Sequence, residues 1–367
     1  MLNLGDLYKV AKAMVPLYVW LGFGYAFVRW WRITSQQCKA IERLVFFIIL
    51  PLFTFHLTMR TDPFAMNYRM IGADAMSKVL VAALLMAWPR CRRWPGHRDQ
   101  ERPGSCWAIT SFSLTQLTNS LVVGVPLVTA MYGPRAQEVV VQLSVVQAIL
   151  WLPLLQFVFE LRKAGCSSFF PAAEAQSQVA SSIEAPPPPP SREVVGGAGD
   201  GAAARSSSCS LIKVVLLKLA KNPNSYAGIV GMTWALLAKR WHFETPSIIE
   251  DSIQPVSVAG RWMSMFSLGL FMASQGKIFS CGPRLTAYAM ALKFIGGPAA
   301  MAIGAFLVGL RGEDLNLAII QAAVPQSITS FIFAQEYDLD ADVLSTAVTF
   351  GMLVSLPVLV IYSMILN

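Results

Sequence analysis

Residues 118–120 of this chain read Thr-Asn-Ser, and residues 325–327 read Pro-Gln-Ser. Each polar triplet interrupts a long apolar segment, and the second begins 207 positions after the first. Hydrocarbon cannot satisfy free backbone N–H and C=O groups, so a helix broken within a membrane persists only where it is buried in protein or lines a cavity. Two such breaks in corresponding segments of a repeated sequence are typical of a secondary transporter's binding site, near the middle of the membrane.

The composition indicates a membrane protein. Of the 367 residues, 55% are hydrophobic and only 14% are charged. An all-α integral membrane protein is therefore expected, with helices of about 20 residues that match a hydrocarbon core of about 30 Å. Ten transmembrane helices are predicted, at residues 7–27, 41–59, 70–88, 107–131, 138–161, 217–237, 250–274, 284–309, 314–335 and 342–365.

The net charge of +8 is unevenly distributed. Lys and Arg gather in the connections after the first, third, fifth and seventh predicted helices. By the positive-inside rule these connections are cytosolic, which predicts that both termini lie on the luminal or extracellular side. Because the charges stand in short connections between apolar segments, nucleic acid is not an expected partner.

Residues 164–210 differ in composition from the rest of the chain. They are rich in Ala, Ser and Gly and contain five consecutive prolines at 186–190. A segment of this kind buries too little apolar surface to order itself, so we predict a disordered cytosolic linker. It separates a first five-helix unit, 1–163, from a second, 211–367.

The two units are predicted to be inverted repeats. An odd number of helices in each unit makes the second unit enter the membrane with the opposite orientation. Pro16 and Gly24 recur as Pro223 and Gly231 at the same offset of 207 that relates the two polar triplets.

The breaks predict an anion site. Pro325 has no N–H and disfavours helix at the residue before it, so the ninth helix should stop and restart near Gln326. Asn119 resembles an N-cap for a restarted fourth helix, although Thr118 does not by itself force a helix to stop. Two exposed half-helix starts with positive dipole ends favour an anion, typically a carboxylate. The alternative is that Pro325 only kinks a continuous helix and Asn119 bonds to a neighbour.

Asp74, Lys78 and Lys293 are ionisable residues within predicted transmembrane helices. Asp74 and Lys78 form an i,i+4 pair in the third predicted helix, where such groups usually face a cavity and pair. The pair could support the broken helices and replace a bound cation, and proton-linked switching of Asp74 is a further hypothesis. The alternative is a pair near the helix start that reaches the membrane interface. For the lone Lys293, packing or reaching toward the interface is expected.

Several uncharged polar residues are weaker candidates. Thr54 and Gln147 stand on otherwise apolar helices, where such residues usually join helices and less often contact substrate. Asn224 lies at the start of the sixth predicted helix, as a helix entry or a pocket residue. The six cysteines contain no CxxC pattern and the three histidines are isolated, so no metal site, disulfide framework or cofactor is expected.

Four stretches of the sequence carry a resemblance to a known family. They are Val-Pro-Leu-Tyr at 15–18, Asn-Pro-Asn-Ser-Tyr at 222–226, Phe-Ser-Leu-Gly-Leu-Phe-Met-Ala at 266–273 and Gln-Ala-Ala-Val-Pro-Gln at 321–326. In these stretches the chain resembles the PIN-FORMED auxin efflux carriers of plants, and the similarity covers both units. Its short linker resembles the short-loop subgroup, which is associated with the endoplasmic reticulum. The resemblance implies ten helices in two inverted five-helix repeats, with the fourth and ninth crossing, and assembly as a homodimer.

The resemblance also implies a substrate, indole-3-acetate, bound as its anion near the crossing. Asn119 matches the family's carboxylate-binding asparagine. Pro325 matches the crossing proline of the ninth helix, with Gln326 and Ile328 beside it.

Other positions match the family less closely. Thr54 stands where members carry serine, Gln147 matches a polar position beneath the site, and Asn224 matches a second pocket asparagine. Asp74 and Lys78 match the acid–base pair of a supporting site.

Two departures concern the pocket. Thr118 replaces a proline of the fourth helix, which softens that break, and Leu152 replaces an aromatic residue, so the indole ring is held differently or a related aromatic acid is preferred.

The sequence therefore predicts a secondary transporter, and not an enzyme. It would move indole-3-acetate out of the cytosol by alternating access, into the endoplasmic reticulum lumen or across the plasma membrane. The first alternative is a proton- or sodium-coupled organic-anion exchanger with Asp74 as the ion ligand. The second is a membrane sensor that binds without transporting.

Overall fold

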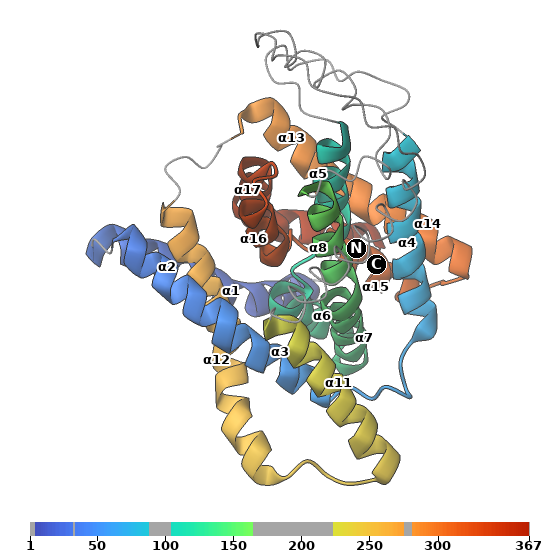
Figure 1. Cartoon of the computed structure of the whole chain (residues 1–367). Helices are drawn as coiled ribbons and strands as arrows, with labels where there is room; N and C mark the ends of the chain where they lie inside the picture. The colour runs from blue at the N-terminus through green and yellow to red at the C-terminus, as the bar shows by residue number, and fades with distance from the viewer. Residues whose placement is uncertain (1–3, 32–33, 88–103, 164–222, 275–280, 367) are drawn as a thin grey trace, which may run out of the picture.

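The computed structural model describes residues 4–31, 34–87, 104–163, 223–274 and 281–366 (Figure 1). These ranges are almost wholly helical and contain no β-strand. The predicted linker at 164–210 lies outside them, as does the side chain of Asn224. The helices are α1 Leu4–Trp31, α2 Ser35–Leu44, α3 Leu50–Met59, α4 Tyr68–Ala87, α5 Gly104–Gln116, α6 Val125–Tyr132, α7 Pro134–Val146, α8 Leu152–Lys163, α11 Pro223–Trp241, α12 Ser247–Ser274, α13 Pro283–Ala291, α14 Gly297–Val308, α15 Glu313–Ala323, α16 Ile328–Glu336 and α17 Ala341–Leu366.

Four π-helical turns belong to longer helical runs. Val45–Ile49 joins α2 to α3, Gln147–Trp151 joins α7 to α8, and Leu292–Gly296 joins α13 to α14. Ser120–Gly124 leads into α6. Such turns insert an extra residue into the helix and are frequent at functional sites; three of the four contribute residues to the candidate site described below.

Seven helical runs are long and apolar enough to cross a membrane. They are Ala11–Trp30, Gln36–Met59, Tyr68–Ala87, Pro134–Arg162, Ser247–Ser274, Pro283–Val308 and Ala341–Leu366. They correspond to seven of the ten predicted helices.

The three remaining predicted helices do not meet the length and composition criterion for crossing a membrane, for different reasons. The predicted helices at 107–131 and 314–335 are interrupted, so neither contains an unbroken helix of 18 residues. The prediction at 217–237 begins outside the described residues, and the last turn of α11 carries the charged Lys239 and Arg240. Length and composition therefore support seven spans among the described residues, and not ten.

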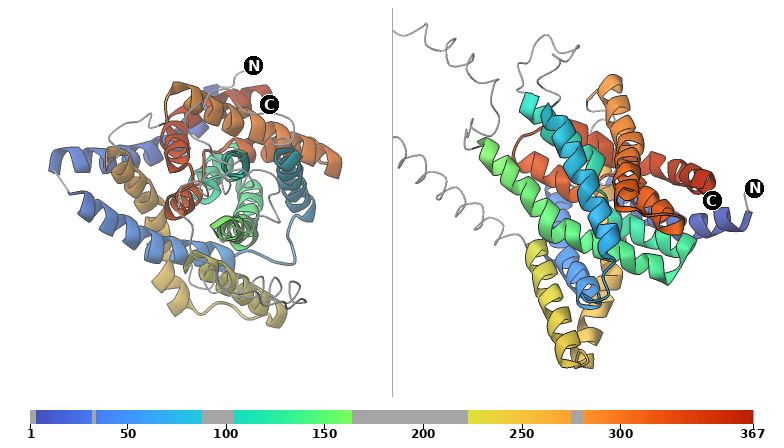
Figure 2. Two further views of the ribbon diagram at one scale, coloured as in Figure 1. Left: turned by 45° about the horizontal axis from the view of Figure 1, so that its top comes forward. Right: turned by 90° about the vertical axis from the view of Figure 1, so that its right-hand side faces the viewer.

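The helices pack in long side-by-side pairs. α1 lies along α12, α11 along α3, and α4 along α14. Figures 1 and 2 show α11 and α12 extending together away from α5, α13 and α17. Between α6 and α7 the chain reverses at Gly133, whose φ of +81° suits glycine, and Pro134 then begins α7. This tight reversal packs α7 against α6 and so brings the following turn, from Gln147, beside the interrupted segment.

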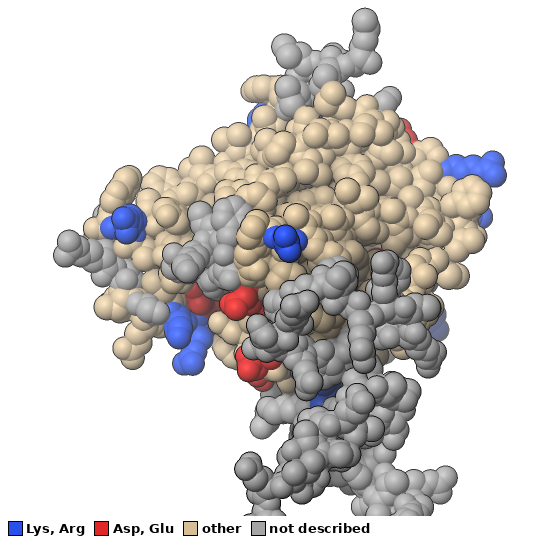
Figure 3. All heavy atoms as spheres, turned by 90° about the horizontal axis from the view of Figure 1, so that it is seen from above, with Lys and Arg blue, Asp and Glu red and all other residues tan. Residues whose placement is uncertain are grey.

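The outer surface is apolar over wide areas. Large side chains such as Trp30, Phe306 and Ile365 are more than 70% exposed. On the face in Figure 3, most atoms outside the grey segments belong to uncharged residues, and charged groups are sparse. Contiguous apolar surface of this extent is unfavourable in water and suits a lipid environment, which agrees with the prediction of an integral membrane protein.

Helix backbones touch at glycines in both units. A Cβ on Gly24 would overlap the backbone carbonyl of Phe266 in α12, and one on Gly269 would overlap that of Leu21 in α1. At Gly231 in α11, an added Cβ would lie 2.9 Å from Cβ of Thr58 in α3. Gly24 and Gly231, which recur at the offset of 207, therefore both allow close helix contact.

We expect Gly24→Leu to separate α1 from α12 and to lower the melting temperature. Overpacking at a close contact costs about 1–3 kcal/mol. Gly22→Leu is the matched control, because nothing lies within 4 Å of a Cβ at that position on the same helix. Thermal unfolding of the purified protein in detergent measures both, and equal melting temperatures for the two variants would contradict the close contact.

Candidate functional site

The helical backbone is interrupted at both polar triplets. α5 ends at Gln116, residues 117–119 are not helical, and the helical path resumes at Ser120. α15 ends at Ala323 and α16 begins at Ile328. Val324 has an extended ψ of 141°, the conformation that a following proline favours. The alternative of a continuous helix that is only kinked at Pro325 is therefore wrong.

The two interrupted segments hydrogen-bond to each other. The Asn119 N–H donates to the Pro325 carbonyl at 2.8 Å, and the Ser327 N–H donates to the Leu117 carbonyl at 3.3 Å. Together these bonds form an isolated antiparallel bridge, with Thr118 opposite Gln326. Each break thus supplies backbone partners that the other lacks.

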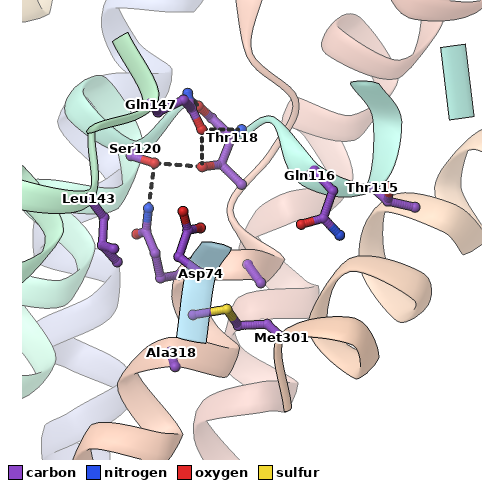
Figure 4. Close-up of a pocket in the computed structure, with 11 residues that line it drawn as sticks. Asp74, Thr115, Gln116, Thr118, Ser120, Leu143, Gln147, Met301 and Ala318 are labelled. Atoms are coloured by element: carbon purple, nitrogen blue, oxygen red, sulfur yellow. Dashed lines mark hydrogen bonds between the residues drawn. The ribbon is translucent and has the colours of Figure 1, made fainter. Parts of the chain in front are cut away.

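Gln147 completes the hydrogen bonding of this bridge. Its Oε1 accepts from the Thr118 N–H at 3.2 Å, and its Nε2 donates to the Thr118 carbonyl at 2.8 Å. The Thr118 and Ser120 hydroxyls lie 2.5 Å apart, beside the amide (Figure 4). Gln147 therefore pairs both backbone groups of Thr118, which point away from the other interrupted segment.

A cavity lies beside the bridge and is partly open to the outside. Five predicted site residues line it: Thr54, Thr118, Asn119, Gln147 and Ile328. The remainder of its wall combines apolar side chains with hydroxyl groups. These residues are Phe46, Leu50, Ser120, Leu121, Val122, Ser144, Ala148, Leu152, Ser264, Ser327 and Thr329. Leu152 lies in the wall, so the departure from the family pattern at this position affects the cavity directly.

A second, smaller cavity lies behind the bridge (Figure 4). Thr118, Ser120 and Gln147 line both cavities, so the bridge forms a shared wall. Asp74 also lines the second cavity, and its Oδ1 is paired with the Lys78 ammonium.

Lys78 does not reach the membrane interface. It is 2% exposed, and its ammonium lies 5.2 Å from the ring centroid of Trp151. The alternative of an acid–base pair that extends to the interface is therefore wrong.

The second cavity contains buried polar atoms without hydrogen-bond partners in the described part of the protein. They are Oδ2 of Asp74, Nε2 of Gln116 and Oε1 of Gln321. The Gln321 Nε2 donates to the Ser120 hydroxyl and so links α15 to the opposite break. Neither Gln116 nor Gln321 was predicted as a site residue. For Gln321, the signal in the sequence was its position one helical turn before Pro325.

Not every predicted residue lines a cavity. Gln326 is 1% exposed, and its Nε2 donates to the Ser113 carbonyl at 3.1 Å and to the Ser330 hydroxyl at 2.7 Å. Pro325 contributes its carbonyl to the bridge, and neither residue belongs to the wall of either cavity. The Asn224 side chain lies outside the described residues.

Lys293 also lies at the breaks. It is fully buried, and its ammonium donates to the Leu117 carbonyl at 3.2 Å. Of the two expected outcomes, packing within the protein or reaching toward the interface, the burial of Lys293 agrees with packing.

The larger cavity is chemically suited to an amphipathic anion. Asn119 is half-buried, and its side chain makes no capping bond to the turn that follows. The first residues of α16 lie in the wall, where helix N–H groups are unpaired and the helix dipole is positive. Among the described residues that line this cavity none carries an acid, whereas Phe46, Leu50 and Ile328 offer apolar surface. No group of three or more potential metal ligands occurs within the described ranges.

Comparison with known proteins gives a consistent result. The family model described as "Membrane transport protein" matches residues 9–363. The chain is 57% identical over 371 residues to probable auxin efflux carrier component 5a of Oryza sativa subsp. japonica, covering 100% of this chain and 99% of the relative. It is 53% identical to auxin efflux carrier component 5 of Arabidopsis thaliana and 36% identical to component 8 of the same plant, each over 99% of this chain and 98% of the relative.

We expect Gln147→Leu to destabilise the bridge. The substitution leaves the N–H and C=O of Thr118 without partners, at about 1–3 kcal/mol for each buried group. Ser144→Ala, one turn earlier on the same run, removes only a hydroxyl bonded to its own helix at the Val140 carbonyl. Melting temperatures of the two variants in detergent test this, and a Gln147→Leu protein as stable as Ser144→Ala would rule out the proposed role.

Proposed function

This chain belongs to the membrane transport protein family, among the short-loop PIN-FORMED auxin efflux carriers, and from that membership we propose that it transports the indole-3-acetate anion out of the cytosol. It is a transporter and not an enzyme. The observation that carries the substrate assignment is the cavity beside the hydrogen-bonded bridge, which combines unpaired helix starts with an apolar wall.

The proposed binding mode follows from the presence of both a polar side and an apolar side in the wall of this cavity. The carboxylate lies at Asn119 and the first residues of α16, where amide donors and the positive helix end favour an anion. The ring packs on apolar residues such as Leu152 and Ile328. Thr54 and Gln147 complete the polar side of the wall, and Asn224 is retained as a second pocket asparagine from the family resemblance. Pro325 and Gln326 hold the break in place instead of contacting the substrate.

The proposed architecture is ten membrane helices in two inverted repeats, with the interrupted fourth and ninth helices crossing at the bridge. Packing supports it: α1 with α12 is the first helix with the seventh, and α11 with α3 is the sixth with the second. Each pair becomes the other when the two repeats are exchanged. The pair of α4 and α14, third and eighth, maps onto itself.

Transport proceeds by alternating access around this crossing. A membrane potential contributes about 2.3 kcal/mol per charge per 100 mV, and it moves an anion toward the positive side. We propose the endoplasmic reticulum membrane as the location, with the plasma membrane as the alternative, the termini luminal or extracellular, the linker cytosolic, and a homodimer as the assembly.

A proton- or sodium-coupled organic-anion exchanger is the second candidate. It is favoured by the Asp74 carboxylate, whose Oδ2 lacks a hydrogen-bond partner among the described residues and lines the second cavity. The ion pair with Lys78 weighs against it, because the ammonium already supplies the positive charge that a bound cation would bring.

Asn119→Ala should raise the KM for indole-3-acetate by about 10–100-fold in proteoliposomes, because a hydrogen bond to a charged group contributes about 1.5–3 kcal/mol. Asn316→Ala is the control, since the Asn316 amide donates to the Leu366 carbonyl at 2.6 Å and lines neither cavity. Undiminished transport by the Asn119 variant would exclude the site assignment. Binding of indole-3-acetate without flux in the wild type would instead support a sensor.

The uptake of indole-3-acetate into proteoliposomes should respond to an imposed potassium diffusion potential, and an interior-positive potential should accelerate it. Replacing sodium, or imposing a pH gradient at constant ionisation of the substrate, should leave the rate unchanged. A rate that depends on either ion gradient would favour the exchanger.

A further inference from the structure

Lys293 is a buried lysine that the proposed binding mode does not use. Its side chain is 0% exposed, and its ammonium forms no ion pair with the described acidic residues. Its hydrogen bond goes to a backbone carbonyl, that of Leu117 at 3.2 Å. An ammonium group withdrawn from water costs several kcal/mol unless it is compensated, so its presence at this point requires an explanation.

The local backbone brings Lys293 to the break. The π-helical turn Leu292–Gly296 places it between α13 and α14. Directly after this turn, a Cβ on Gly297 would lie 2.5 Å from the Thr115 carbonyl, so the two backbones are in contact. Thr115 is two residues before Leu117, and the contact therefore holds the ammonium at the end of α5.

The Leu117 carbonyl is shared between the two sides of the bridge. It accepts the Ser327 N–H from the opposite break and the Lys293 ammonium from the neighbouring helical run. The C-terminal end of α5, where helix carbonyls are unpaired, also favours a cation at this place. Thr118, the next residue, lines both cavities. The charge of Lys293 thus lies one residue behind the wall of the larger cavity.

Acidic groups around the cavities do not cancel this charge. Among the described residues that line either cavity, Asp74 is the acid, and it is already paired with Lys78. A fully buried positive charge is screened weakly by salt and acts over several ångströms.

We propose that Lys293 is a positioning residue that supplies the counter-charge for the bound carboxylate. It acts through the Leu117 carbonyl and the bridge without touching the substrate. It makes the crossing select an organic anion over the neutral analogue of the same shape. This inference rests on the proposed function.

The test compares two ligands and three variants of the full chain, purified and reconstituted in lipid nanodiscs. The ligands are indole-3-acetate and its neutral amide, indole-3-acetamide. Lys293→Gln removes the charge but keeps an amide donor for Leu117, and Lys293→Arg keeps the charge. Lys239→Met is the control, because this exposed lysine in the last turn of α11 pairs with Asp62 at 3.1 Å and lines neither cavity. Lys293→Met replaces the glutamine variant if that protein does not fold.

Lys293→Gln should weaken indole-3-acetate binding about tenfold or more and change amide binding less than about twofold, a ratio that purely structural damage would not alter. Lys293→Arg should retain most of the preference for the acid, and Lys239→Met should retain all of it. An unchanged acid-to-amide ratio in Lys293→Gln overturns the inference, whether both affinities persist or both fall together, and leaves the proposed function standing. A wild-type protein that neither prefers indole-3-acetate to its amide nor transports it would overturn both this inference and the proposed function.

Discussion

A peptide group that leaves a helix inside a hydrocarbon layer must find its hydrogen bonds within the protein, because each unpaired group there costs several kcal/mol. The two breaks in this chain meet that requirement together. Asn119 and Pro325 exchange one bond, Leu117 and Ser327 another, and Gln147 takes the groups of Thr118 that face away. Each break supplies hydrogen-bond partners to the other, so the bridge fixes where the end of α5 meets the start of α16.

The surface proposed to bind the substrate follows from the same constraint. Ending a helix to form the bridge exposes the start of the next one, and α16 begins in the wall of the larger cavity. Thr118, Ser120 and Gln147 belong to the walls of both cavities, so any rearrangement of the bridge changes both at once. Close packing completes the arrangement: at Gly297 the backbone of α14 contacts that of α5, which a side chain would prevent.

Much of this organisation could be predicted from local sequence. Pro325 removes an N–H and restricts its predecessor, which is sufficient to end α15, and the polar triplet at 118–120 identified the partner break. The apolar runs identified seven helices that also meet a length and composition criterion in the structure. The other three predictions could not be supported in that way, because two helices are interrupted by the breaks themselves and the third extends beyond the described residues.

Local sequence is enough to indicate a helical membrane protein with two helix breaks and a polar residue, Asn119, at one of them, because backbone hydrogen bonding and hydrophobic length are local properties. Which side chains bond at the breaks depends on the packing of the whole chain. Gln326 turns to Ser113 and Ser330 and away from the cavity, whereas Gln147, Gln321 and Lys293 come from other helices to bond at the breaks. Those contacts depend on how helices distant in sequence pack against one another, and no periodicity within a single segment records that.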